Sequence, residues 1–527
     1  MSGDMSVGEA LVHLLEAHGV EVVFGIPGVH TAELYRGLAV SKIRHVTPRH
    51  EQGAGFMADG YARVTGRPGV CFVITGPGLT NTVTAMAQAR ADSVPMLVVS
   101  GVNARSSLGK GRGFLHELPD QNGLIASFAK ASFTLTDARE LAATLARCLG
   151  LAVSGRPGPV HLEIPTDVMV ERMATVDTIA FEVERPPPDA ASLQSAASLI
   201  KGARAPVILS GGGAVAADRP LRLFAERADA PVVLTVNGRG LMADHALRVP
   251  ASPSLAPVRD LIASSDLVVA VGTEFGPTDY DMYADGGFPK LRQLVRIDIS
   301  EAQINAGPPP DAAIVADSAA ALTALSKMLP EAGGRDGADR AAATRRAAMA
   351  GLDAGIAGQV ALLHRLQRVV PQARFVGDST QLVYAGNLYF DALRPGQWFN
   401  SATGYGSLGY VPPGAIGAAI ADPSAPVVAI VGDGGLQFSL AELGVAAEEG
   451  LDVVFLVWNN HGYREIESFM LDAAITPVGV KPAPPEMSWI AKAYGLGFRR
   501  AEDEAQLIDS VAACARKGGA HLVEYAL

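Results

Sequence analysis

Two polar turns directly follow two strongly apolar segments in the last quarter of the chain. The segment 427–431 leads into a Gly-Asp-Gly-Gly turn, and the segment 453–458 leads into an Asn-Asn-His-Gly turn. One β-α-β crossover separates the turns, so Asp433 and Asn460 are expected side by side at the carboxyl ends of neighbouring parallel strands. Their oxygens suit Mg²⁺, which shares its ligands with phosphate. Each turn alone is more often just a turn, but the pair at this spacing favours a metal and diphosphate site.

This pair of turns resembles the signature of thiamine-diphosphate enzymes, which opens with Gly-Asp-Gly and ends in Asn-Asn. The resemblance implies thiamine diphosphate and Mg²⁺ as cofactors. It makes Asp433 and Asn460 side-chain ligands of Mg²⁺ and gives Gly462 a carbonyl ligand. The cofactor-binding residues of the first turn are Gly432, Asp433, Gly434 and Gly435. Gly434 and Gly435, which have no side chain, leave their backbone amides free to approach a diphosphate.

A second pattern lies far upstream, where Glu51 stands at the start of a predicted amphipathic helix with the apolar register Ala54, Met57, Ala58, Tyr61 and Ala62. On its own, Glu51 is a favourable carboxylate for a helix start. Its Gly-x-x-x-x-Asp-Gly-Tyr-Ala neighbourhood also resembles the family helix whose glutamate hydrogen-bonds N1′ of the cofactor's aminopyrimidine. That resemblance makes Glu51 catalytic, because a carboxyl group in an apolar cleft has the raised pKa that suits proton exchange at neutral pH.

Two further segments resemble family loops around the cofactor. Residues 404–410 resemble the loop that holds the cofactor bent, with Leu408 as the apolar wedge and Gly406 as a carbonyl acceptor for the 4′-amino group. The loop that meets the diphosphate is matched with lower specificity, because such loops also serve as helix caps. Its residues are Asp378, Ser379, Thr380 and Gln381.

The first block of the chain supplies candidates for contact with a 2-oxo acid substrate. Three segments match family loops that face the substrate across a subunit boundary, and they contain Val29 and His30, Gly76, and His116. A lone loop histidine is more often a solvated turn residue. Among the histidines His30, His50, His116 and His461, we select His116 as the catalytic candidate.

Short apolar runs alternate with helical stretches through the whole chain, which predicts an α/β fold with three doubly wound parallel-sheet domains. The resemblance assigns residues 1–180 to a pyrimidine-binding domain, 190–330 to a central domain and 352–527 to a diphosphate- and Mg²⁺-binding domain. A Pro-rich stretch at 185–188 reads as a linker. The Ala- and Arg-rich segment 330–351 reads as either a poorly packed linker or a solvated helix.

Composition limits the partners. A formal charge of −11 argues against a nucleic-acid surface, which needs clustered Lys and Arg. The chain shows no apolar run of membrane-spanning length and no basic, apolar leader at its start. Its three cysteines, far apart and without metal-ligand spacing, are expected to be free and buried. We therefore expect a cytoplasmic protein with a small-molecule 2-oxo acid as its partner.

Within the family the chain looks closest to acetolactate synthases, but three features depart from them. Glu274 and Thr166 stand where those synthases carry cations, and an acid at 274 does not suit the diphosphate of FAD, so FAD is not expected. The sequence also ends at Leu527, where the synthases continue into an arm that closes the active site.

Other short segments, including the one with Glu465 and Glu467 just after the second turn, resemble segments of decarboxylases that act on 5-guanidino-2-oxopentanoate. Carboxylates near the cleft would pair with a guanidinium, although they could equally be solvated surface acids. We therefore expect non-oxidative decarboxylation of a 2-oxo acid, and the candidate substrate is 5-guanidino-2-oxopentanoate, which would give 4-guanidinobutanal and CO₂. The alternatives are an acetolactate synthase that joins two pyruvates and an FAD-containing oxidase or synthase of the same fold. The family's site shared between chains implies a homodimer at minimum, and a homotetramer is preferred.

Overall fold

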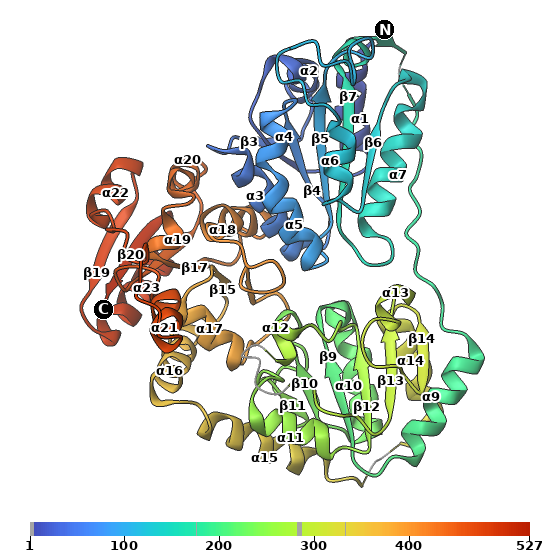
Figure 1. The fold of residues 1–527 in the computed structure, drawn as a ribbon, viewed down its shortest axis with the longest axis vertical. Helices are drawn as coiled ribbons and strands as arrows, with labels where there is room; N and C mark the ends of the chain where they lie inside the picture. Colours follow the sequence, from blue (N-terminus) through green and yellow to red (C-terminus); the bar gives the residue numbers. More distant parts are fainter. Residues whose placement is uncertain (1–4, 175, 282–286, 332–333) are drawn as a thin grey trace. The chain divides into compact units, whose positions relative to one another are not determined.

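The computed structural model describes residues 5–174, 176–281, 287–331 and 334–527, and it contains three six-stranded sheets (Figure 1). The strand pairs within these sheets are parallel, and helices cover both faces of each sheet. The predicted fold class is therefore confirmed. By its contacts the chain divides into two compact units, one running to Glu184 and including Tyr405–Asp503 and Asp509–Leu527, and the other formed by Arg185–Gly404 with Glu504–Ile508.

The first sheet has the strand order β3-β2-β4-β5-β7-β6. Its strands are β2 (Val22–Gly25), β3 (Arg44–Val46), β4 (Gly69–Val73), β5 (Met96–Val102), β6 (Ala131–Thr134) and β7 (Pro159–Pro165). The helices around it are α1 (Val7–Ala17), α2 (Ala32–Leu38), α3 (Glu51–Thr65), α4 (Pro77–Asn81), α5 (Val83–Ala91), α6 (Gln121–Ala126), α7 (Leu141–Val153) and α8 (Thr166–Met169). The central strands are apolar along their whole length because both faces are covered. A short antiparallel ribbon joins β1 (Met5–Ser6) to β8 (Arg172–Met173).

The second sheet has the order β11-β10-β9-β12-β13-β14. Its strands are β9 (Pro206–Ser210), β10 (Val232–Leu234), β11 (Arg248–Val249), β12 (Leu267–Val271), β13 (Leu294–Asp298) and β14 (Ala312–Val315). The main helices are α9 (Ala190–Gly202), α10 (Asp218–Ala228), α11 (Ala256–Ser264), α14 (Ser318–Met328) and α15 (Gly337–Ala350), with short helices α12 (Pro277–Tyr280) and α13 (Glu301–Ile304).

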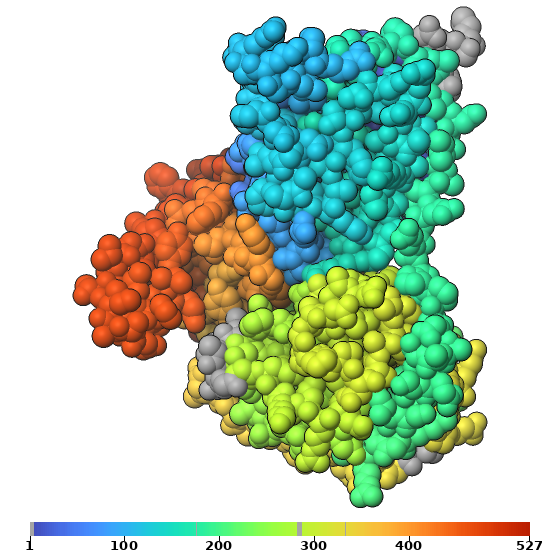
Figure 2. Space-filling view, turned by 45° about the vertical axis from the view of Figure 1, so that its right-hand side comes forward, coloured from blue at the N-terminus to red at the C-terminus, as the bar shows by residue number. Residues whose placement is uncertain are grey.

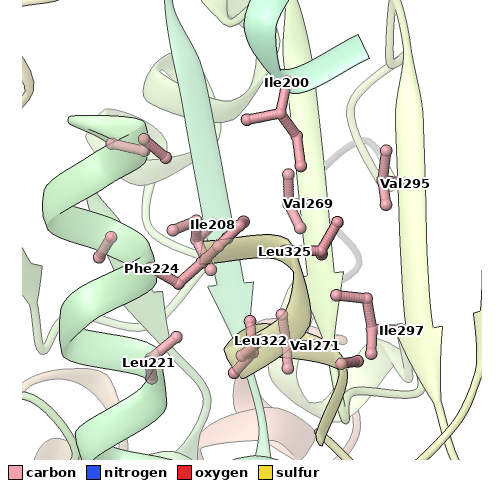
Figure 3. Packing of buried hydrophobic residues seen from close by; sticks show 14 of the residues in the cluster. Ile200, Ile208, Leu221, Phe224, Val269, Val271, Val295, Ile297, Leu322 and Leu325 are labelled. Atoms are coloured by element: carbon pink, nitrogen blue, oxygen red, sulfur yellow. The ribbon is translucent and has the colours of Figure 1, made fainter. Parts of the chain in front are cut away.

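Strand β9 shows why this sheet needs helices on both sides. Ile208 points into the core formed with α9, α10 and α14, whereas Val207 and Leu209 point into the opposite core, which includes residues of α11 and α15. Figure 3 shows Ile208 beside Phe224 in the first of these cores. Alternate residues of one strand therefore fill two separate cores.

The third sheet has the order β16-β15-β17-β18-β20-β19. Its strands are β15 (Arg374–Gly377), β16 (Trp398–Asn400), β17 (Val427–Gly432), β18 (Val453–Asn459), β19 (Gly497–Ala501) and β20 (His521–Ala526). The helices are α16 (Ala354–Val369), α17 (Gln381–Leu388), α18 (Val411–Ala421), α19 (Asp433–Leu436), α20 (Leu443–Glu448), α21 (Arg464–Asp472), α22 (Met487–Tyr494) and α23 (Glu504–Lys517). Figure 2 shows the surface of the same structure in a space-filling view, coloured along the sequence as in Figure 1.

Some expectations from the sequence are refined here. The segment 330–351, left open as linker or solvated helix, contains helix α15, whose Ala341 and Ala348 are buried in the core on one side of the second sheet. The three cysteines are free and buried, as expected. Among the described helices, none is long and apolar enough to cross a membrane.

Candidate functional site

The two turns predicted to bind metal and diphosphate lie together at the carboxyl ends of the central strands β17 and β18. Strands β17 and β18 pair in parallel with Gly432 opposite Trp458. The two turns that follow these strands therefore leave the sheet at the same end. Asp433 is the first residue of α19 and is fully buried. The backbone N–H of Asn460 donates to Oδ1 of Asp433 at 3.4 Å. The structure therefore places the two residues that the sequence paired next to each other.

The groups at this edge fit a hard cation. A carboxylate, a side-chain amide and a backbone carbonyl are available from Asp433, Asn460 and Gly462, and Mg²⁺ prefers such oxygen ligands. Gly462 has φ of 139°, and a Cβ there would lie 2.4 Å from the carbonyl oxygen of Val480, so only glycine places this carbonyl. Burial raises the pKa of Asp433, and a bound cation would offset that effect. Across the described ranges no group of three or more His, Cys, Asp or Glu forms a metal site.

The structure gives a packing reason for the glycine at position 434, which the sequence did not reveal. A Cβ at this position would lie 2.5 Å from the ring of Tyr463. The glycine therefore lets the aromatic ring of the second turn pack directly on the first turn. The same small residue leaves the backbone accessible for an anion.

Glu51 begins helix α3, and the ring of His50 accepts the N–H of Gln52 at the helix start. The Oε2 atom of Glu51 accepts a hydrogen bond from Nδ2 of Asn81 at 2.9 Å. Asn81 therefore orients the carboxylate that the sequence singled out. Sequence reasoning missed Asn81, because nothing in its own neighbourhood connects it to Glu51.

Helix α3 is buried more completely than its amphipathic register predicted. The residues from Gly53 to Ala62 are all buried, because α18 of the same unit covers the side turned away from the first sheet. Glycines make this close crossing possible: a Cβ at Gly60 would lie 2.0 Å from the carbonyl oxygen of Gly414, and one at Gly417 would lie 1.9 Å from that of Met57. The predicted apolar register of this helix is buried as expected, and its other face is buried too, since the covering helix comes from a distant part of the chain.

Glu442 is a second residue that the sequence did not indicate. Its side chain accepts the backbone N–H of Arg49 at 3.0 and 3.1 Å and that of His50 at 3.0 Å. It is 1% exposed. Burial raises the pKa of Glu442 to about 7, and the two N–H donors only partly offset that effect. Glu442 thereby fixes the chain immediately before Glu51.

We expect Glu442→Gln to reduce the pH dependence of stability between pH 4.5 and 7. The folded pKa of about 7 exceeds the ordinary value of 4.5, so in this range the folded state holds a proton that the unfolded state has lost. Stability is therefore full at low pH and falls as pH rises through this range. Glutamine does not titrate, yet its carbonyl still accepts the N–H groups of Arg49 and His50. Thermal unfolding midpoints at pH 5, 6 and 7 measure the difference.

Glu448→Gln is the matched control, because the Glu448 side chain is 58% exposed and pairs with Arg49 at the surface. This variant should keep the slope of the wild type. Parallel curves for wild type and Glu442→Gln would show that Glu442 titrates like an exposed glutamate.

Three of the four substrate-loop candidates meet in the first domain. The rings of His30 and His116 are nearly perpendicular, with centroids 5.5 Å apart, and Nδ1 of His30 lies 2.8 Å from Oγ1 of Thr75. Burial, and to a lesser degree the charge of His116, lowers the pKa of His30. A Cβ at Gly76, where φ is 65°, would lie 2.5 Å from the carbonyl oxygen of His116, which explains the glycine. Val29, in contrast, is 91% exposed.

A cavity of about 280 Å³ lies beside His30. It is lined by His30, Asn103, Ala104, Ser106, Ser107, Phe114, Leu115 and Thr166. Its volume suits a small metabolite. These lining residues mix polar side chains with the apolar Phe114 and Leu115, and none of them is acidic.

Gln121 forms hydrogen bonds that fix the position of the loop containing Gly76. Its Oε1 accepts the N–H of Gly76 at 2.9 Å, while its Nε2 donates to Glu163 Oε2 at 2.8 Å and to the carbonyl oxygen of Gly101 at 3.0 Å. Gln121 and Glu163 are both buried. This contact links the substrate loop to the carboxyl end of β7, and the sequence gave no sign of it.

The two acids proposed for a cationic substrate differ in the structure. Glu467 forms ion pairs with Arg464 at 2.8 Å and with Lys481 at 2.7 Å, and these cations lower its pKa. Glu465 is solvent-exposed on α21. Within the described residues no ion pair engages it. Glu465 is therefore the more available carboxylate.

The remaining cofactor candidates lie in two loops. Gly406 has φ of 73° and is exposed, and Leu408 is half-buried. In the other unit, Asp378 is fully buried and its Oδ1 accepts the N–H of Ser379 at 2.8 Å. Thr380 directly precedes α17, which begins at Gln381.

Three segments match protein-family descriptions that share one cofactor. Residues 5–124 match "Thiamine pyrophosphate enzyme, N-terminal TPP binding domain", residues 193–325 match its central domain, and residues 378–525 match its C-terminal TPP binding domain. The chain belongs to the thiamine pyrophosphate enzyme family. Thiamine pyrophosphate is another name for thiamine diphosphate, so this member is a thiamine-diphosphate-dependent enzyme.

Similar proteins cover almost the whole chain. A probable 2-ketoarginine decarboxylase, AruI, of Pseudomonas aeruginosa is 44% identical over 99% of this chain and 94% of its own length. The acetolactate synthase isozyme 1 large subunit of Escherichia coli is 31% identical over 86% of this chain and 81% of its own. An acetolactate synthase of Mycobacterium bovis is 32% identical over 95% and 85%. This family member therefore resembles both a decarboxylase and synthases of the same kind.

Proposed function

We propose that this enzyme uses thiamine diphosphate and Mg²⁺ to decarboxylate a 2-oxo acid non-oxidatively, and that its preferred substrate is 5-guanidino-2-oxopentanoate. The products are 4-guanidinobutanal and CO₂. The observation that carries the proposal is the identity to the probable 2-ketoarginine decarboxylase along both chains. The two acetolactate synthases described above have a lower sequence identity to this chain, 31% and 32%.

The cofactor would be held at the edge of the third sheet. Asp433, Asn460 and Gly462 would supply three oxygen ligands for Mg²⁺, and a cation held there would offset the charge of the diphosphate. The backbone of Gly432, Gly434 and Gly435, and the loop formed by Asp378, Ser379, Thr380 and Gln381, are proposed to line the diphosphate. Gly406 and Leu408 are proposed to face the pyrimidine and the bend. When bound, the cofactor supplies an electron sink for the pair of electrons that CO₂ leaves behind.

Glu51 is the proposed acid and base at the pyrimidine. Its Oε2 is oriented by Asn81, and the preceding backbone is fixed by Glu442, so the remaining oxygen can hold and release a proton in one place. A positioned carboxyl group needs little reorganisation when it exchanges that proton.

His30 and His116 are the proposed proton donors to the product. One proton must replace the departing CO₂ on the former carbonyl carbon for the aldehyde to form. Burial lowers the pKa of His30, which disfavours the charged, proton-donating form of its ring.

The cationic substrate tail is proposed to meet an acid on α21. Glu465 is the candidate, since Arg464 and Lys481 already engage Glu467. We also infer that the enzyme works without FAD, because Glu274 and Thr166 replace cations that the synthases carry. A homodimer at minimum, with a homotetramer preferred, and a cytoplasmic location stay predictions from the sequence.

The test compares 5-guanidino-2-oxopentanoate with pyruvate. We expect kcat/KM for CO₂ release to be about tenfold to a hundredfold higher with the guanidino acid, since a hydrogen bond to a charged group contributes roughly 1.5 to 3 kcal/mol. The Glu465→Gln variant should lose most of this margin, whereas Glu467→Gln should keep most of it. The product should be an aldehyde.

Asp472→Asn is the matched control, because Asp472 is an exposed acid at the end of the same helix. Its substrate preference should equal that of the wild type. If pyruvate is turned over more efficiently and acetolactate accumulates, the enzyme is an acetolactate synthase and the acids of α21 are surface charges. A yellow purified protein would point to a flavin-containing oxidase or synthase.

A further inference from the structure

One short turn of the first domain contacts both histidines of the proposed site. We name residues 75–78 the Gly76 turn. Oγ1 of Thr75 lies 2.8 Å from Nδ1 of His30. The carbonyl oxygen of His116 packs against Gly76, where a Cβ would lie 2.5 Å from it. The places of the two rings therefore depend on the conformation of this turn.

The same turn leads to Glu51. Gly76 is the N-cap of α4, its carbonyl oxygen accepts the N–H of Thr80 at 2.9 Å, and Asn81 is the last residue of that helix. Asn81 donates to Oε2 of Glu51 at 2.9 Å, and a Cβ at Gly78 would lie 3.7 Å from Oε1 of the same carboxylate. A shift of the turn would therefore move the groups that flank both oxygens of Glu51.

The backbone of Gly76 adopts a conformation that needs support. Its φ of 65° and ψ of −110° lie in a region that residues with a side chain rarely adopt. The N–H of Gly76 donates to Oε1 of Gln121 at 2.9 Å, a side chain 45 residues further along the chain. Gln121 is 4% exposed. One buried side-chain amide thus holds the turn in its unusual conformation.

The amide of Gln121 can satisfy its neighbours in only one orientation. Its Nε2 donates to the carbonyl oxygen of Gly101 at 3.0 Å and to Oε2 of Glu163 at 2.8 Å. The other oxygen of Glu163 accepts the hydroxyl of Thr134 at 2.7 Å. Burial raises the pKa of Glu163, but a protonated acid would not free the amide, because the carbonyl of Gly101 can only accept. Oε1 of Gln121 is therefore left for the N–H of Gly76.

We propose that Gln121 is a positioning residue for proton transfer, which fixes the Gly76 turn and thereby the places of Glu51 and the two histidines. This rests on the proposed function, which assigns proton exchange at the pyrimidine to Glu51. Small displacements of a reacting group slow proton transfer strongly. All the contacts from Gln121 to Glu51 join residues around the first sheet. The positioning is therefore the same whichever chain of an oligomer supplies the cofactor groups of the third sheet.

The test is Gln121→Met, which removes both amide atoms and keeps a long unbranched side chain. We expect exchange of the C2 proton of bound thiamine diphosphate to slow by about tenfold, the scale of one lost hydrogen bond. Deuterium exchange is measured at saturating thiamine diphosphate and Mg²⁺, so that weaker binding cannot imitate slower exchange. The Kd for thiamine diphosphate should stay at the wild-type value, because the proposed metal and diphosphate groups belong to the third sheet.

Ser6→Ala is the matched control for a purely structural effect. Ser6 is 1% exposed, and its Oγ accepts the backbone N–H of Glu9 at 3.2 Å at the start of α1. It therefore loses the same kind of bond in the same domain, away from the Gly76 turn. This variant should lower the thermal midpoint of the cofactor-free protein and exchange at the wild-type rate. If Gln121→Met behaves in the same way, Gln121 is structural only and the inference is wrong.

The wild type separates failure of the proposed function from failure of the inference. A wild type that does not bind thiamine diphosphate removes both. A wild type that binds it and exchanges the C2 proton, with Gln121→Met exchanging equally fast, removes the inference alone. If Gln121→Met does not fold, Gln121→Asn decides, because it keeps the amide but shortens its reach toward Gly76. Slower exchange in that variant supports the positioning role, and wild-type exchange overturns it.

Discussion

Glu51→Gln is expected to slow exchange of the C2 proton of bound thiamine diphosphate by at least about 10²-fold, the low end for loss of a positioned acid or base. Glutamine keeps the size of the side chain, and its carbonyl oxygen can still accept from Asn81. It cannot, however, give up and regain a proton. Deuterium exchange at C2, followed by quenched-flow NMR, measures the rate directly and needs no knowledge of the substrate.

Retention of the cofactor should be nearly unchanged in Glu51→Gln, because the metal and diphosphate groups lie in other loops. Glu21→Gln is a suitable control, since Glu21 is an acid of the same domain that pairs with Arg67 at the surface. It should exchange at the wild-type rate. Wild-type exchange in Glu51→Gln would show that another residue activates the pyrimidine.

Asp433→Ala should abolish Mg²⁺-dependent retention of thiamine diphosphate. Asp433 is the single carboxylate among the proposed oxygen ligands, so its loss removes the one formal negative charge of that ligand set. Dialysis of the loaded protein with and without Mg²⁺, followed by measurement of the remaining cofactor, gives the result. Asp433→Asn keeps the size and should retain a small fraction.

Asp452→Ala serves as the control for this experiment. Asp452 directly precedes β18, at the opposite end of the same pair of strands, where its carboxylate accepts the N–H of Gly519 at 2.6 Å. This variant should lose some stability and keep its cofactor. Wild-type retention by Asp433→Ala after dialysis against a chelator would exclude Asp433 from the metal site.

The parts of the site that the sequence predicts are those encoded within one crossover. Asp433 and Asn460 follow consecutive strands of one β-α-β unit, so the rules of parallel sheets suffice to bring them together. The central strands were predictable for a similar reason, because each is a short continuous apolar run. The edge strands β3, β6 and β19 lack such a run, since most of their residues are partly or fully exposed.

The features of the site that could not be predicted from the sequence depend on contacts between segments far apart in the chain. Glu442 and His50 are 392 residues apart, and no local pattern marks either residue for the other. The complete burial of α3 escaped for the same reason, because α18 supplies the cover. The ion pairs of Glu467 with Arg464 and Lys481 could not be predicted either, because the sequence alone does not show which acidic side chains are paired with a cation.

The pairing of α3 with α18 has a consequence for how the protein is made. Tyr410 and Asp59 are 351 residues apart, so a ribosome working at about 5 to 20 residues per second needs roughly 20 to 70 seconds between them. During that interval the nascent first domain presents Phe56, Asp59 and the glycine-rich side of α3 to water. The nascent chain therefore exposes an apolar and partly charged surface for most of its synthesis. Chaperones bind surfaces of this kind.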